Sequence, residues 1–110
     1  LFDAGFDVIR LNLRDHGPTH HLNEGLFHSN RLPEVLGAVA AIQARAPGLP
    51  LSLAGFSLGG NFALRVGAHA RESGLRIERI VAVCPVLDPA VTLEALERGP
   101  ALYREYFLLK

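Results

Sequence analysis

The chain has 110 residues, a formal net charge of +0 at pH 7 and a hydrophobic fraction of 49%. This length suffices for one small domain, and the composition is typical of a folded globular protein, neither disordered nor membranous. The balanced charge gives no electrostatic basis for binding nucleic acid, and no apolar run reaches the ~18 residues of a membrane span. A single cysteine, Cys84, excludes an internal disulfide and fits a reducing, cytoplasmic compartment. The sequence does not indicate an oligomeric state.

The first residues predict the end of one helix and then a strand. Residues 1–5 are typical of a last helical turn that is closed by Gly5. Residues 7–13 follow as a strand, because their β-branched and apolar side chains cluster as in a strand covered on both faces. Since the chain begins in mid-pattern and stops inside a predicted helix, we expect an internal segment of a longer protein, with residues 1–110 forming a partial domain.

A polar, histidine-rich connection occupies residues 14–30. Loops of this length are usually functional or hold a short helical turn. Ser29 or Asn30 is expected to cap the next helix, and Pro33 fits its first turn. The apolar face of that helix is formed by residues at helical spacing, namely Leu32, Val35, Leu36, Val39 and Ile42.

The motif Gly55-x-Ser57-x-Gly59 joins a predicted strand at residues 50–54 to a helix expected to run to about Ser73. This order is typical of a nucleophile elbow, a sharp turn that holds a serine hydroxyl above a sheet. Both positions are expected to require a small residue, because a larger side chain there would collide with the crossing strand and helix. The helix N-terminus would favour developing negative charge. The alternative is a glycine-rich turn that only packs or binds phosphate, which the strand–turn–helix context disfavours.

The rest of the chain continues the alternation of helix and strand. The helix after Ser57 is expected to be closed by Gly74 and to bury a stripe formed by Phe62, Val66 and Ala70, with Ala63 and Gly67 allowing close approach to the sheet. Residues 77–84 predict a third strand, in which Cys84 would be a small buried hydrophobe. Two helices, at residues 91–97 and 102–109, are separated by Gly99 and Pro100. The order predicts an α/β fold with parallel βαβ units, three strands and flanking helices.

Three stretches together resemble the α/β-hydrolase superfamily: residues 55–61 around Ser57, residues 12–17 before it and residues 84–88 after it. Within the superfamily the chain is most similar to the bacterial YheT-type esterases, which often have Arg-Gly-Cys or Arg-Gly-His where this chain has Arg14, Asp15 and His16. The resemblance covers nearly the whole chain and the middle third of such a protein. It implies a serine hydrolase acting on a carboxylic ester or similar acyl substrate, without a cofactor.

The resemblance also assigns site residues. Ser57 would be the nucleophile and the backbone N–H of Leu58 one oxyanion-hole donor. The second donor, the acid and the general-base histidine would lie beyond the ends of the chain. His16 and Phe56 are expected to contact substrate, although His16 fits equally a loop residue that bonds nearby backbone. Asp88 is a candidate acid, but the frequency of Asp at turns and helix caps favours a local role.

The remaining histidines are not expected to act on Ser57. His69 would lie at least ~15 Å along the helix axis from Ser57, at 1.5 Å per residue. His20, His21 and His28 lack a carboxylate or cysteine at ligand spacing, so no metal site is predicted.

The resemblance places the start of an inserted lid at about residue 85, with Tyr103, Tyr106 and Phe107 either in that lid or in the core. It also implies that an upstream strand separates residues 8–13 from residues 51–54. We therefore expect either a slot or a direct pairing between these two segments, with exposed edges.

The isolated segment is expected to be inactive. The alternatives are a non-catalytic binding protein of the same fold, or acyl transfer or haloperoxidase-type chemistry.

Overall fold

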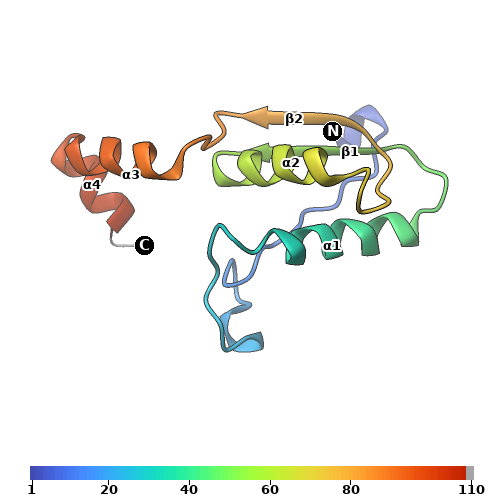
Figure 1. Ribbon diagram of the computed structural model, residues 1–110, viewed down its shortest axis with the longest axis horizontal. Coiled ribbons are helices and arrows are strands. Elements are labelled where there is room, and N and C mark those ends of the chain that lie inside the picture. Colours follow the sequence, from blue (N-terminus) through green and yellow to red (C-terminus); the bar gives the residue numbers. More distant parts are fainter. Residues whose placement is uncertain (109–110) are drawn as a thin grey trace.

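The computed structural model describes the backbone of residues 1–108 and the side chains of residues 1–102 and 104–106. The predictions for Leu109 and for the side chains of Tyr103 and Phe107 lie outside the described residues. In chain order the elements are η1 (Phe2–Ala4), η2 (His20–Leu22), α1 (Leu32–Arg45), β1 (Leu51–Phe56), α2 (Leu58–His69), β2 (Ile77–Val83), α3 (Pro89–Arg98) and α4 (Ala101–Leu108) (Figure 1).

The sheet consists of β1 and β2, which pair in parallel with α2 connecting them. Leu53 lies opposite Ile80 and Gly55 opposite Ala82, so both strands end at the same edge of the sheet. The predicted α/β class and the parallel βαβ unit are confirmed. The prediction of three strands is wrong, since the described part of the chain forms two.

The missing strand is the one predicted at residues 7–13, which have no regular secondary structure. A strand exists through hydrogen bonds to a neighbour, and within residues 1–108 the free edge of β1 makes no ladder with this segment. Val8, Ile9 and Leu11 stay exposed, Ile9 at 64%, whereas Leu13 is partly buried against the core. The structure therefore shows no direct pairing between the two segments, and the expected exposed edge is present on β1.

The core lies where α2 packs against both strands on one side and against α1 on the other. Val66 is 0% exposed, and Phe62 is also buried, as the helical stripe predicted. Gly67 faces β2 so closely that an added Cβ would collide with the Ile80 side chain. The face of α1 contributes Leu32, Val35 and Val39 to the same core.

Helix ends differ from the prediction in two places. The residue before α1 is Arg31, which makes no capping bond through its side chain, so neither Ser29 nor Asn30 is the cap. Helix α2 ends at His69, and the N–H of Leu75 bonds the carbonyl of Ala70 at 2.8 Å in the turn that follows. This early turn brings Leu75 into the core, whereas Gly74 has the positive φ of 66° expected of a residue that closes a helix.

The opposite face of the sheet is open. Side chains alternate along a strand, so Ala54 and Phe56 of β1 and Val81 and Val83 of β2 point away from α2, and all four are exposed. Cys84 is exposed as well, which corrects its predicted burial, because β2 ends at Val83 and Cys84 turns away from the sheet with a φ of 45°.

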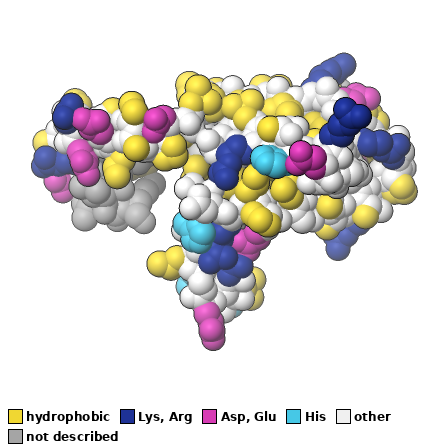
Figure 2. Space-filling view, in the orientation of Figure 1, with side chains coloured by type: hydrophobic (Ala, Val, Ile, Leu, Met, Phe, Trp, Pro, Cys, Tyr) yellow, Lys and Arg dark blue, Asp and Glu magenta, His cyan; other side chains and the backbone are white. Residues whose placement is uncertain are grey.

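The α3–α4 pair projects beyond the carboxyl ends of β1 and β2, the edge of the sheet at which Ser57 lies (Figure 1 and Figure 2). The two helices are divided at Gly99 and Pro100, as predicted. At the other end of the chain, η1 forms a short helical turn that Gly5 closes with a φ of 83°, which confirms that interpretation in outline. None of the helices in the described residues has the length and apolar character required to traverse a membrane.

Candidate nucleophile site

Ser57 occupies a strained turn between β1 and α2. Its φ of 50° and ψ of −119° lie in a region that residues with a Cβ rarely adopt. Ser57 is the N-cap of α2, yet its hydroxyl makes no capping hydrogen bond, and the residue is exposed. The hydroxyl of Ser57 is therefore exposed at the carboxyl edge of the sheet and does not cap the helix.

The glycines around Ser57 differ in what they permit. A Cβ on Gly55 would collide with the backbone of Gly59 and Gly60, as the motif predicted. At Gly59 an added Cβ meets nothing within 4 Å, so the expectation of a collision there is wrong. The second close approach is made by Gly60 instead, whose added Cβ would lie 3.2 Å from the Pro85 side chain. The reason is that the loop after β2 crosses α2 at Gly60.

Backbone hydrogen bonds hold the turn from both sides. The N–H of Ser57 donates to the carbonyl of Val83 at the end of β2, at 3.0 Å. The carbonyl of Ser57 accepts two bonds, from the N–H of Asn61 at 3.1 Å and from the N–H of Val86 at 3.2 Å. The strained residue is therefore tied to β2, to α2 and to the loop that follows β2.

A buried amide, to which the sequence pattern assigns no role, extends this arrangement. Asn61 is 9% exposed, and its Nδ2 donates to the carbonyl of Val86 at 2.7 Å. Its Oδ1 accepts from Nη1 of Arg65 at 3.4 Å, and the same nitrogen donates to the carbonyl of Ser29 at 2.6 Å. The signal in the sequence was a single amide directly beside the apolar stripe of α2, because a buried polar side chain requires partners.

The start of α2 supplies hydrogen-bond donors next to the hydroxyl. Leu58 is the first residue of α2, so no carbonyl of the helix lies one turn before its N–H. Such N–H groups, together with the helix dipole, favour negative charge near the helix N-terminus. The arrangement suits an oxyanion that forms beside Ser57.

Asp88 has a local role in the structure. Its Oδ1 accepts from the N–H groups of Ala90 and Val91 at 2.9 and 3.1 Å, which caps α3. The predicted capping role is confirmed. A catalytic role of Asp88 stays a prediction.

His16 lies in the loop that precedes α1. Its Nδ1 lies 2.8 Å from the carbonyl of Arg14, and because a carbonyl only accepts, this nitrogen carries the proton. The ring meets Phe27 edge-on at 5.2 Å between centroids, and Phe27 in turn lies 5.6 Å from Phe62 of α2. The interpretation of His16 as a loop residue that bonds nearby backbone is confirmed, and its contact with substrate stays a prediction.

Two polar contacts fasten the same loop. Asp15 has a φ of 62°, and its Oδ2 accepts from the N–H of Phe27 at 2.7 Å. Aspartate is among the residues that tolerate such a φ. Nε of Arg14 donates to Oε1 of Glu34 in α1 at 3.0 Å. That hydrogen bond lowers the pKa of Glu34 and raises the pKa of Arg14 from their ordinary values.

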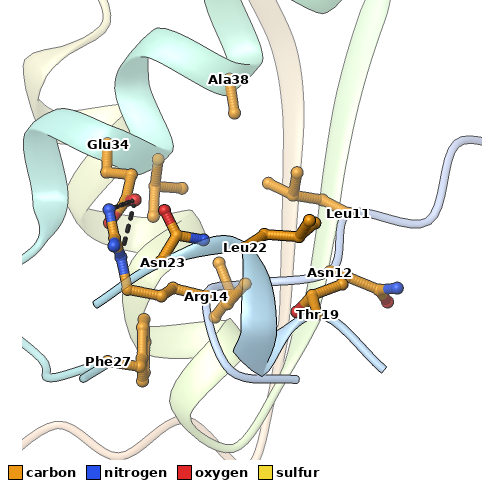
Figure 3. Close-up of a pocket in the computed structure, with 11 residues that line it drawn as sticks. Leu11, Asn12, Arg14, Thr19, Leu22, Asn23, Phe27, Glu34 and Ala38 are labelled. Atoms are coloured by element: carbon orange, nitrogen blue, oxygen red, sulfur yellow. Dashed lines mark hydrogen bonds and ion pairs between the residues drawn. The ribbon is translucent and has the colours of Figure 1, made fainter. Parts of the chain in front are cut away.

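A cavity of about 230 Å³ lies between residues 11–14, η2 and α1. Figure 3 shows Arg14 and Glu34 paired at one side of it, with Leu11 and Leu22 at the other. Ser57 does not line this cavity. The cavity is therefore a feature of the loop and α1, separate from the Ser57 turn.

The other predicted site residues are also placed. Phe56 is 72% exposed on the open face of the sheet, immediately before Ser57. His69 lies in the last turn of α2, where its Nδ1 bonds the carbonyl of Arg65 at 2.9 Å. Among the described residues, no group of three or more His, Cys, Asp or Glu side chains is arranged to hold a metal ion. Nor does any hydrogen bond within those residues join a histidine to the Ser57 hydroxyl.

Ser57 lies in a strained strand-to-helix turn, beside the free N–H groups of that helix. This arrangement is typical of the class of proteins with a nucleophile elbow above a parallel sheet. The family described as alpha/beta hydrolase fold matches residues 1–108, and the chain belongs to this family. No curated protein and no solved structure gives a significant match to the chain.

Proposed function

We propose that the chain carries the nucleophile of a serine hydrolase that acts on a carboxylic ester or a related acyl substrate. The observation that supports this most directly is the backbone of Ser57, with its φ of 50° and its exposed hydroxyl that caps nothing. Strain of this kind persists where the surrounding structure holds it, and it clusters at active sites. Membership of a family with the alpha/beta hydrolase fold supports the same reaction class.

In the proposed reaction the hydroxyl oxygen of Ser57 attacks the acyl carbon, and its proton passes to a histidine base and then to the departing alcohol. The N–H of Leu58 donates to the oxyanion while the tetrahedral intermediate exists. Water then hydrolyses the acyl-enzyme. His16 and Phe56 would contact the substrate, with a lid that begins at about residue 85 above the site.

We further propose that the base, the acid and the second oxyanion donor come from parts of a longer, cytoplasmic, YheT-type protein that flank this chain. The segment alone would then turn over substrate more slowly by on the order of 10⁴ to 10⁶, the usual cost of losing triad members. Ser57-dependent esterase activity of the isolated segment would contradict this part of the proposal.

Labelling of the full-length protein with a fluorophosphonate tests the proposal. Ser57 should acquire the adduct, and Ser57→Ala should abolish it. Ser73→Ala is the matched control, because Ser73 is an exposed serine in the turn after α2, and the bond that it makes to the carbonyl of His69 comes from its backbone N–H. A folded protein that acquires no adduct at Ser57 would instead favour a non-catalytic binding role. The products of ester turnover, free acid or a transferred acyl group, separate hydrolysis from acyl transfer.

A further inference from the structure

We propose that Asn61 is a positioning residue for Ser57 and acts through Val86, an inference that rests on the proposed nucleophilic role of Ser57. Asn61 lies one helical turn after Ser57, and at 9% exposed it is the only buried polar residue among the described side chains. Burying an amide costs free energy unless both of its ends find partners. In this molecule both ends do.

The contacts of Asn61 lead back to Ser57 through two bonds. Both backbone polar groups of Val86 are held: the N–H by the carbonyl of Ser57 at 3.2 Å, and the carbonyl by Nδ2 of Asn61 at 2.7 Å. The side chain of Asn61 thus holds Val86 in place, and Val86 in turn donates to the carbonyl of Ser57. Without that amide, Val86 loses the side-chain bond that keeps it against the turn.

Two strained residues make this restraint matter. Ser57 has a φ of 50°, and Cys84, just after β2, has a φ of 45°. Residues in such conformations persist only where neighbouring contacts over-determine them. The loop from Cys84 to Val86 and the Ser57 turn lie against each other, joined by the bonds of Ser57 to Val83 and Val86. The bond from Nδ2 of Asn61 to the carbonyl of Val86 adds a side-chain restraint to these backbone bonds.

An amide is the side chain that this position requires. Its Nδ2 donates to a carbonyl, whereas its Oδ1 accepts from the Arg65 guanidinium, so the two partners fix its orientation. Asn61→Asp would keep the size and the bond to Arg65, but it would place an acceptor against the Val86 carbonyl. The substitution therefore tests the Val86 contact with little change in packing.

The test measures how fast a fluorophosphonate labels Ser57 in the full-length protein. The initial labelling rate is divided by the fraction of sites that are labelled at completion, which gives the rate for each folded site. Asn61→Asp should slow labelling about 10- to 100-fold, because a small misplacement of a reacting group costs rates of that order. For ester turnover, kcat should fall while KM changes little, since the lost orientation matters in the transition state. The control Asn30→Asp, an exposed amide in the turn before α1, should label at the wild-type rate.

A role in folding alone would give a different result. It would lower the labelled fraction of Asn61→Asp but leave the rate for each folded site unchanged, and that outcome would overturn the proposal. If Asn61→Asp does not fold, hydrogen exchange of the wild-type protein decides. The N–H groups of Ser57, Asn61 and Val86 should be protected to the same degree, and free exchange at Val86 would overturn the proposal.

Failure of the proposed function remains distinguishable from failure of this inference. If wild-type Ser57 is never labelled, the hydrolase proposal fails. The exchange experiment then still reports whether Asn61 holds the turn, by comparison of Val86 protection in the wild-type protein and in Asn61→Asp.

Discussion

The β1–α2–β2 unit and residues 6–13 are both rich in apolar and β-branched side chains, yet only the first forms paired strands. In the unit, Val66 is 0% exposed and the strands share a parallel ladder. In the N-terminal segment Val8, Ile9 and Leu11 are exposed and no ladder forms. The difference shows that an apolar pattern becomes a strand only when a neighbour accepts its hydrogen bonds.

The same difference extends to what each region can hold in place. The unit fixes Ser57 in a strained conformation through bonds to Val83, Asn61 and Val86. The N-terminal segment makes far fewer contacts: Leu13 packs against the core, and Arg14 and Asp15 attach the loop to α1 and to Phe27. Four experiments test this contrast, in order of decreasing expected effect.

The largest effect should come from the first glycine of the motif, with the second glycine as its control. Gly55→Ala places a Cβ against the backbone of Gly59 and Gly60, which cannot move away, so we expect a loss of at least about 3 kcal/mol or no folded protein. Gly59→Ala meets no atom within 4 Å and should change the free energy of unfolding by between zero and about 1 kcal/mol in the favourable direction. Urea unfolding monitored by circular dichroism measures both, and equal effects would contradict the geometry of the turn.

The next effect compares the two regions directly. Val66→Ala removes two methyl groups from a fully buried site and should lower the free energy of unfolding by about 2 kcal/mol. Ile9→Ala removes more atoms from an exposed site and should change it by no more than about 0.5 kcal/mol. Denaturant midpoints with unchanged m-values give the comparison. A larger loss for Ile9→Ala would mean that the N-terminal segment is packed after all.

A smaller effect is expected where the N-terminal segment joins the loop. Asp15→Ala removes the acceptor for the part-buried N–H of Phe27 and keeps a Cβ at a φ of 62°, so we expect a loss of about 1 kcal/mol. Asp15→Asn keeps an acceptor and a residue that tolerates this φ, and it should cost less than about 1 kcal/mol. Hydrogen exchange at the Phe27 N–H reports the contact locally, and unchanged protection in Asp15→Ala would refute it.

The smallest effect concerns pH. The hydrogen bond from Arg14 lowers the pKa of Glu34 in the folded state, so this carboxylate stabilises the fold above its unfolded pKa of about 4.3. That contribution should vanish as the pH falls through the lower, folded value. Glu34→Gln should therefore flatten the dependence of stability on pH below about pH 4, whereas Glu24→Gln, an exposed carboxylate of the loop, serves as the control. A wild-type slope retained in Glu34→Gln would exclude the pair as its source.

The sequence by itself determined the elements whose signals are local. The Gly55-x-Ser57-x-Gly59 turn, the apolar stripe of α2 and the helix cap at Asp88 each depend on residues a few positions apart, and each appears in the structure. Short-range sterics and hydrogen bonds decide such features, so neighbouring residue types suffice to predict them.

Only the tertiary structure decided the features that depend on distant segments. Residues 7–13 have the composition of a strand but lack a partner, Cys84 is exposed because β2 ends before it, and Gly60 rather than Gly59 meets the loop after β2. The contact between Asn61 and Val86 likewise joins two elements 25 positions apart. Which chain segments meet in space is set by packing over the whole molecule, and residue types along one segment do not contain that information.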